Sequence, residues 1–215
     1  MNDAAPVTVI CVAGGDGAGK TTQIARLTAF FGERHRKVAP VSIWDAFTDP
    51  AVASKLPFAR PSDIYGYLKL LGPVSRTHFL FHALHLALER AWVRQPNVLL
   101  LNAYWYKYFA TEVAHGGDPA LLRRLAAGFP EPDLTFYLSV SPQGALARKT
   151  HRSDYESGYG EDDQKLLDFQ RRAHQALQAL AVEQSWTELD GRSSPDDITT
   201  AMIQRLKSAG YVQAR

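Results

Sequence analysis

The stretch GGDGAGKTT, residues 14–22, combines glycines, a lysine and two hydroxyl side chains in a spacing that suits nucleotide phosphates. Gly14, Gly19, Lys20 and Thr21 fit the pattern G-x-x-x-x-G-K-[ST], between an apolar run and a segment of helical period. Glycines let backbone N–H groups approach phosphate oxygens, and the start of a helix adds partial positive charge. Lys20 can reach the β- and γ-phosphates, and the Thr21 hydroxyl can bind magnesium. The pattern predicts a site for ATP and Mg²⁺ formed by Gly14, Gly15, Asp16, Gly17, Ala18, Gly19, Lys20, Thr21 and Thr22.

Composition and charge fit a globular protein of the cytoplasm and argue against several other classes. The chain has 215 residues, 46% hydrophobic and 21% charged, as is ordinary for a globular protein. Its formal net charge of +2 creates no large field, so we expect no binding to bulk nucleic acid or to a membrane surface. Cys11 is the only cysteine and can form no intrachain disulfide, which suits a reducing compartment. The apolar stretch 7–13 is too short to span a membrane.

Apolar runs and segments of helical period alternate along the chain. Strands are predicted at 7–13, 37–43, 98–101, 134–140 and 186–190, and helices after the phosphate loop and at about 62–72, 76–94, 118–127, from 141, 163–184 and 193–206. The polar, glycine-containing residues 150–163 predict a long loop. The alternation predicts one α/β domain over 1–215 with the P-loop NTPase fold: a five-stranded parallel sheet flanked by helices, with a mobile lid at about 149–163.

The third apolar run ends in unusual residues. Proteins with a phosphate loop usually carry a carboxylate at the tip of a neighbouring strand, where it helps to hold magnesium. Here Val98–Leu101 is followed by Asn102 and Ala103, and Asn102 offers a carbonyl oxygen without charge. We therefore expect Thr21 and Asn102 to be the metal ligands. The aromatic run YWYKY, residues 104–108, is interpreted as the exit of the strand, with side chains on alternate sides.

Several segments together closely resemble the thymidylate kinase family. The loop GGDGAGKTTQIARL matches the family pattern D-G-x-G-K-T-T-Q. The similarity continues in EPDLTFYLSVSPQGALAR (131–148), FQRRAHQALQALA (169–181) and ELDGRSSPDDITTAMIQRL (188–206). The resemblance implies an enzyme that moves the γ-phosphate of ATP to dTMP with magnesium, often as a homodimer. It also implies that Asp16 contacts the acceptor sugar, Lys20 the donor phosphates and Thr21 the magnesium ion.

The family resemblance also assigns a role to the basic residues near the lid. Ala18 leaves the loop without the basic residue that some members carry there. Members of that type bring positive charge from the lid, where Arg148, Lys149 and Arg152 are suitably placed. The transition state spreads negative charge over equatorial oxygens, so we expect Arg148 and Arg152 to be catalytic beside Lys20. The alternative is a solvated basic turn.

The acceptor half departs from the family. The family's D-R-[YFH] motif falls on Asn102, Ala103 and Tyr104, and its R-E-P motif falls on WDAF, which keeps a carboxylate at Asp45. A further family arginine belongs within THFLFHALHLALER, residues 77–90, where no arginine precedes Arg90. At least two arginines that would hold an acceptor phosphate are therefore missing.

Other residues are candidates for the acceptor site. His78, His82, His85 and Glu89 form one stripe of a helix, which suits phosphate contact, a metal or simple packing. Arg76 is the first candidate for a displaced phosphate arginine, with Lys69 and Lys107 as weaker ones. Aromatic side chains that can stack on a base or fill the core are Tyr65, Tyr67, Phe81, Tyr104, Trp105, Tyr106 and Tyr108. We expect Asp16, Arg76, Phe81, His82, His85 and Tyr104 to bind the substrate.

The sequence favours an ATP- and magnesium-dependent nucleotide kinase acting on dTMP. A first alternative is a kinase of the same fold that phosphorylates a nucleoside or another hydroxyl compound, with Asp45 as the catalytic base. A second alternative is a non-catalytic ATP-binding protein that regulates a partner.

Overall fold

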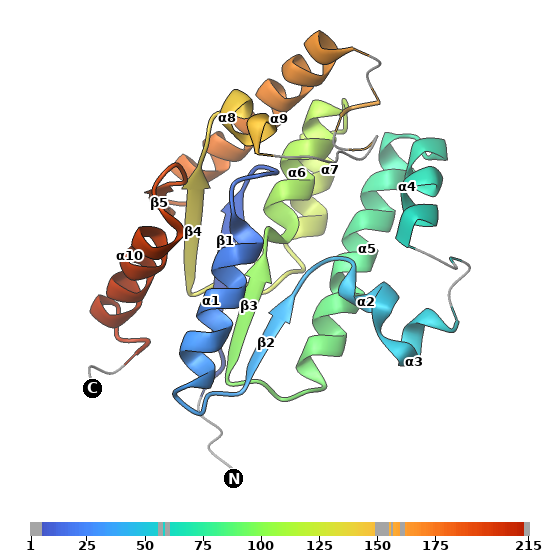
Figure 1. The fold of residues 1–215 in the computed structure, drawn as a ribbon. Helices are drawn as coiled ribbons and strands as arrows, with labels where there is room; N and C mark the ends of the chain where they lie inside the picture. The colour runs from blue at the N-terminus through green and yellow to red at the C-terminus, as the bar shows by residue number, and fades with distance from the viewer. Residues whose placement is uncertain are drawn as a thin grey trace.

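The computed structural model describes residues 6–55, 58, 61–148, 155, 157–159 and 162–212. Within these residues, strands and helices alternate as the sequence predicts (Figure 1). The elements are β1 (Thr8–Gly14), α1 (Lys20–Gly32), β2 (Val38–Val41), α2 (Asp45–Thr48), α3 (Pro50–Ala53), α4 (Pro61–Leu70), α5 (Pro73–Trp92), β3 (Val98–Asn102), α6 (Tyr104–Ala114), α7 (Pro119–Ala126), β4 (Leu134–Ser139), α8 (Pro142–Ala147), α9 (Asp163–Glu183), β5 (Thr187–Asp190) and α10 (Pro195–Ser208).

The five strands form one parallel sheet in the order β2-β3-β1-β4-β5, which confirms the predicted α/β fold. β1 is central and pairs with β3 on one side and with β4 on the other. β2 contains Pro40 and lies at the edge of the sheet, where a missing backbone donor is tolerated. Because the strands are parallel, their carboxyl ends share one edge, and the segments that follow β1, β2 and β3 meet there.

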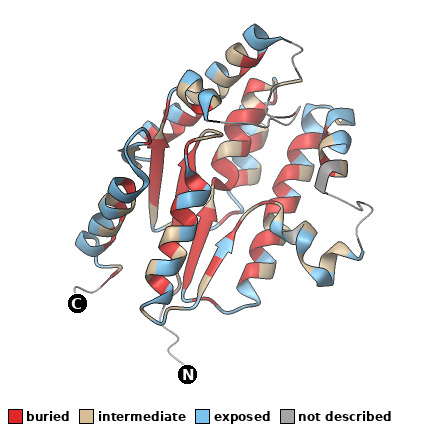
Figure 2. Cartoon of the chain, in the orientation of Figure 1, coloured by how far each residue is buried: buried red, intermediate tan, exposed pale blue. Residues whose placement is uncertain are grey.

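Both faces of the sheet are covered, which explains the apolar runs in its central strands. Along β1, Val9, Cys11 and Ala13 face a core shared with α5, α6 and α9. Ile10 and Val12 face the opposite core, shared with α1 and α10. Figure 2 shows the central strands as buried along most of their length. Cys11 has no exposed surface. In the part of the chain described here, no helix is long and apolar enough to cross a membrane.

Several helices begin at residues whose side chains cap the first turn. Ser194 accepts a hydrogen bond from the Asp197 N–H at 3.1 Å at the start of α10, and Asp162 accepts one from the Lys165 N–H at 2.7 Å at the start of α9. Ser141 caps α8 in the same way. These caps fix the starts of the helices that flank β4 and β5.

The aromatic run after β3 is helical, so its interpretation as a strand exit was wrong. Tyr104–Ala114 forms α6, whose first turn contains the residues YWYK. Aromatic side chains favour strands, and the usual side-chain cap is missing, so the sequence carries no helix-start signal here. The chain turns instead at Ala103, which has φ 68° and ψ −34°.

Much of the predicted lid lies outside the described residues, namely 149–154, 156, 160 and 161. Among its described residues, Tyr155 is buried at 2% exposure. Gly158 has φ 68°, and a Cβ atom there would lie 2.5 Å from the Phe169 ring of α9. This part of the lid segment is therefore packed against the body of the protein, and its motion stays a prediction.

Candidate active site

The phosphate loop joins β1 to α1 and depends on glycines at positions with positive φ. Gly17 has φ 80° and Gly19 has φ 93°. A Cβ atom on Gly17 would lie 2.5 Å from the carbonyl oxygen of Ala145 in α8, so only glycine fits between the loop and that helix. Gly19 precedes Lys20, the first residue of α1. The first turn of α1 therefore lies at the loop, and the N-terminus of a helix is an arrangement that binds anions.

Lys20 and Thr21 hold their functional groups at this loop. The Lys20 side chain is buried, and its Nζ donates a hydrogen bond to the Gly15 carbonyl oxygen at 2.6 Å. The Thr21 Oγ1 lies 3.4 Å from the Asn102 Nδ2 at the end of β3. The two predicted metal ligands, 81 residues apart, are thus neighbours. With the Asn102 amide turned over, both residues would offer neutral oxygen atoms.

A cavity of about 420 Å³ lies in front of the loop, at the carboxyl ends of the strands. Its lining comes from the loop and from the segments after β2, β3 and β4. The lining residues are Asp16, Gly17, Gly19, Lys20, Thr21, Thr22, Ser42, Trp44, Tyr65, Asn102, Ala103, Lys107, Tyr108 and Arg148. The structure thus brings together six of the nine predicted loop residues, both predicted metal ligands and one of the predicted lid arginines.

Three aromatic side chains form part of this lining: Trp44, Tyr65 and Tyr108. Trp44 and Tyr65 pack edge to face, with ring centroids 5.8 Å apart. Tyr65 and Tyr108 belong to the aromatic set singled out in the sequence, whereas sequence reasoning missed Trp44 and Ser42. Their only sequence signal is that they follow β2 directly, where a parallel sheet places ligand-binding residues.

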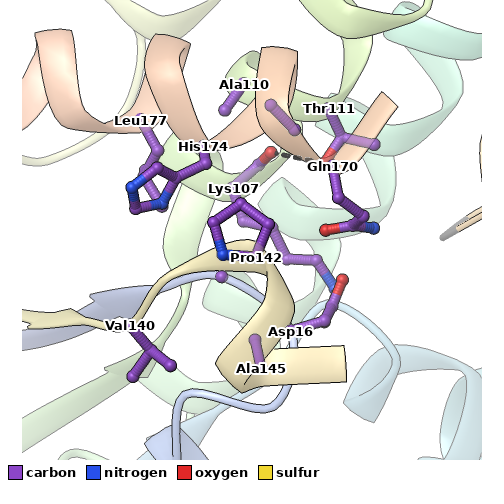
Figure 3. A pocket seen from close by; sticks show the side chains of 12 residues that line it. Asp16, Lys107, Ala110, Thr111, Val140, Pro142, Ala145, Gln170, His174 and Leu177 are labelled. Carbon is purple, nitrogen blue, oxygen red and sulfur yellow. Dashed lines mark hydrogen bonds and ion pairs between the residues drawn. The ribbon is translucent and has the colours of Figure 1, made fainter. Parts of the chain in front are cut away.

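Lys107 of α6 forms an ion pair with Asp16 of the loop. Its Nζ lies 2.6 Å from the Asp16 Oδ1, and the two side chains are 17% and 18% exposed. Figure 3 shows the two side chains pointing toward each other, beside a second cavity of about 30 Å³ between α6, α8 and α9. That cavity is too small for a nucleotide. The Thr111 Oγ1 donates to the Lys107 carbonyl oxygen at 2.9 Å one turn further along α6.

The corner between β3 and α6 has an unusual backbone. Ala103 and Tyr104 have φ values of 68° and 57°, in the region that favours glycine. Such residues cost about 1–3 kcal/mol each and cluster at functional sites. The corner is held by the Ala103 N–H, which donates to the Val12 carbonyl oxygen at 2.9 Å, and by the Tyr104 hydroxyl, which donates to the Pro130 carbonyl oxygen at 2.7 Å. It starts α6 at once, so that Lys107 in the first turn reaches the loop.

Of the predicted catalytic residues Asp45 and Arg148, only Arg148 lines the large cavity. The Asp45 carboxylate accepts a hydrogen bond from the Ser42 N–H at 2.7 Å and does not line the large cavity. Arg148 does line it, and its Nη1 donates to the Gly191 carbonyl oxygen at 2.8 Å. Arg152 lies outside the described residues. The catalytic roles of these residues stay predictions.

Arg76 is part of a buried polar cluster and does not line the large cavity. Its Nε donates to both carboxylate oxygens of Glu112, at 2.9 and 3.0 Å, and the side chains are 6% and 0% exposed. The Tyr155 hydroxyl donates to the Glu112 Oε1 at 3.0 Å. Burial raises the pKa of Glu112, against the opposing effects of Arg76 and Tyr155. Separating such a pair leaves a charge unpaired in the interior, at a cost of about 3–5 kcal/mol.

His115, the residue directly after the end of α6, completes this cluster. A ring nitrogen of His115 lies 3.3 Å from the Tyr155 carbonyl oxygen. Burial, followed by the positive charge of Arg76, lowers the pKa of His115 to about 4. The imidazole is therefore neutral at physiological pH.

The remaining predicted substrate residues do not line the large cavity either. Phe81 and His85 of α5 pack on Phe129, with ring centroids 5.6 and 3.8 Å apart, and burial lowers the pKa of His85. Tyr104 packs on the same ring at 5.6 Å, and His82 is exposed. These contacts give Phe81, His85 and Tyr104 a packing role, and their contact with a substrate stays a prediction.

The phosphate loop at the carboxyl edge of a five-stranded parallel sheet, with helices on both faces, defines a P-loop kinase type of α/β protein. Residues 80–202, more than half of the chain, match the family model described as thymidylate kinase. The chain belongs to the thymidylate kinase family, whose members are nucleotide phosphotransferases.

Individual relatives agree with this assignment. The chain is 26% identical to the thymidylate kinase of Chlorobaculum tepidum over 215 residues, covering 92% of this chain and 96% of the relative. It is 23% identical to the thymidylate kinase of Carboxydothermus hydrogenoformans, covering 88% and 91% of the two chains. A match to the thymidylate kinase of Dictyostelium discoideum is 30% identical over 101 residues, and it covers 47% of this chain and 42% of that relative.

Proposed function

We propose that this chain transfers the γ-phosphate of ATP to a nucleoside monophosphate, with dTMP as the favoured acceptor. The observation that supports this is that Lys20 and Thr21 line the same cavity of about 420 Å³ as Trp44, Tyr65 and Tyr108. Its volume is typical of small-molecule sites. A donor phosphate at the loop and a flat base against the aromatic rings would therefore meet in one space.

The donor side would use the loop and α1. Backbone N–H groups at the start of α1 and the Lys20 ammonium would bind the β- and γ-phosphates, with Lys20 exchanging the Gly15 carbonyl oxygen for a phosphate oxygen. Arg148, on the side of β4, would place a second cation against the charge that develops during transfer.

Magnesium fits the neutral oxygen donors at this site. Thr21 and Asn102 can each supply one oxygen atom, and Mg²⁺ commonly takes its remaining ligands from phosphates and water. When bound, the ion would neutralise charge on the phosphates. Within the described residues, no group of three or more His, Cys, Asp or Glu side chains is arranged to hold a metal. The proposed site therefore relies on the nucleotide for most of its ligands.

The acceptor side favours a monophosphate over a nucleoside. A nucleoside hydroxyl needs a base to remove its proton, whereas a phosphate monoester is already largely ionised near pH 7. Asp16 is the one carboxylate among the described residues that line the cavity, and it is paired with Lys107. Asp45 lies outside that lining and binds the Ser42 N–H. Stacking of the acceptor base on the aromatic rings would contribute about 1–3 kcal/mol.

ADP release from Mg-ATP with dTMP, with thymidine and without acceptor tests this proposal. We expect release that depends on dTMP and falls at least roughly 100-fold in Lys20→Ala, because the variant lacks the cation on the transferred phosphate. A response to thymidine as strong as that to dTMP would support the nucleoside kinase instead. ATP binding without release in any arm would refute the proposed transfer and support a regulatory ATP-binding protein.

A further inference from the structure

We propose that Lys107 binds the phosphate group of the acceptor nucleotide and so makes the site select a monophosphate over a nucleoside. This inference rests on the proposed function, because it identifies how the same cavity recognises its acceptor. Lys107 lies in the first turn of α6 and lines the large cavity.

The position of Lys107 within the sheet topology separates it from the other cations. Among the described residues that line the cavity, the cationic ones are Lys20, Lys107 and Arg148. Lys20 begins α1 and binds the Gly15 carbonyl oxygen of the loop, and Arg148 lies on the β4–β5 side, where it binds the Gly191 carbonyl oxygen. Lys107 follows β3, on the opposite side of β1, where Trp44, Tyr65 and Tyr108 form the aromatic part of the lining. It is therefore the cation on the side that would receive the acceptor.

The ion pair with Asp16 places the Lys107 ammonium at the edge of the phosphate loop. The 2.6 Å contact holds the Nζ beside the loop that would bind the donor phosphates. An ammonium group has three N–H donors, so Lys107 can keep its contact with Asp16 and donate to a phosphate oxygen as well. Both side chains are largely shielded from water, which strengthens their interaction with a further charge. A cation here would reduce the repulsion between the acceptor phosphate and the γ-phosphate.

Arg76 is the competing candidate, and its contacts argue against it. Both carboxylate oxygens of Glu112 bind its Nε, and its Nη1 donates to the Leu71 carbonyl oxygen at 3.1 Å. Its recruitment to a phosphate would break this buried pair, whereas Lys107 already lines the cavity. The geometry thus favours a lysine on α6 over an arginine on α5.

The test is the equilibrium binding of dTMP and of thymidine to wild type, Lys107→Met and Lys107→Arg, measured by calorimetry. Methionine keeps the length and apolar stem of lysine and removes the charge. We expect Lys107→Met to weaken dTMP binding roughly 10- to 100-fold, the value of a charge-assisted hydrogen bond, and thymidine binding less than about 3-fold. Lys107→Arg should retain most of the dTMP affinity. Lys207→Met changes an exposed lysine of α10 and serves as the matched control, with melting temperatures checking that every variant is folded.

Each outcome either supports or overturns the role of Lys107. A selective loss of dTMP affinity supports it. An equal loss of affinity for dTMP and thymidine would show that Lys107 acts only by positioning Asp16. An unchanged dTMP affinity in Lys107→Met would show that Lys107 does not bind the acceptor phosphate. A wild type that binds dTMP and thymidine equally would show the same. If wild type prefers dTMP through Lys107 but releases no ADP with it, the inference about Lys107 stands and the proposed transfer is wrong.

Discussion

Replacement of Glu112 by glutamine would leave the Arg76 guanidinium in the interior without a counter-charge. The change keeps the shape of the side chain, so it tests charge and hydrogen bonding rather than packing. In the folded protein, the carboxylate accepts from the Arg76 Nε at 2.9 and 3.0 Å and from the Tyr155 hydroxyl at 3.0 Å, and it has no exposed surface.

The expected loss of stability follows from this burial. Removal of one partner of a buried ion pair costs about 3–5 kcal/mol in the free energy of unfolding. For a domain of this size, the loss corresponds to a fall of roughly 10 °C in melting temperature. The pair of Arg123 and Glu183 is the matched contrast, because its side chains are 48% and 50% exposed and their nitrogen and oxygen atoms lie 2.7 Å apart. Glu183→Gln should cost less than about 1 kcal/mol.

Urea unfolding followed by tryptophan fluorescence would measure both variants. The double variant Arg76→Met with Glu112→Gln should be more stable than Glu112→Gln alone, because no unpaired charge remains buried. The reasoning would be refuted if Glu112→Gln lost no more stability than Glu183→Gln. It would also be refuted if the two changes in the double variant were simply additive.

Three further predictions concern the pH response and the backbone of the site. Burial holds the pKa of His115 at about 4, below its ordinary 6.5, so the contribution of His115 to stability is complete above pH 6.5 and declines as the pH falls toward 4. The difference in free energy of unfolding between wild type and His115→Asn should therefore shrink by about 3 kcal/mol over that range. A difference that stays constant in urea titrations at several pH values would contradict the lowered pKa. Ala103→Gly should raise the free energy of unfolding by about 1 kcal/mol, because glycine adopts φ 68° without strain. The strain that is relieved exceeds the entropy that glycine adds to the unfolded chain. A lower melting temperature of the variant would show that the corner is unstrained. Gly17→Ala should abolish ATP binding in calorimetry, since a Cβ atom 2.5 Å from the Ala145 carbonyl oxygen must displace the loop. The control variant Lys207→Met should bind ATP as wild type does. Unchanged ATP affinity of Gly17→Ala would show that the loop adapts.

The sequence predicted the parts of the site whose geometry is local. The phosphate loop is one continuous segment, so the spacing of its residues alone predicted that they form one loop. These residues include Gly17, Gly19, Lys20 and Thr21. The strands were predictable because both faces of the sheet are covered, which makes residues 9–13 of β1 and 98–101 of β3 continuous apolar runs.

Contacts between distant segments were not predictable in the same way. Asp16 and Lys107 are separated by 91 residues and meet only because β3 lies next to β1. Arg76 is a plausible phosphate ligand in the sequence, yet Glu112, 36 residues later, binds it in the interior. The start of α6 was missed because the turn at Ala103 depends on the backbone, and alanine carries no signal for a positive φ.

The complete burial of Cys11 has a practical consequence for labelling. The thiolate is the form of cysteine that reacts with maleimides, and burial in β1 raises the pKa of the Cys11 thiol well above its ordinary value. Because Cys11 is the only cysteine of the chain, a cysteine introduced at an exposed position such as Gln178 of α9 would be the one reactive thiol. A fluorophore or spin label can therefore be attached at a single chosen site without first removing a native cysteine from the core of the sheet.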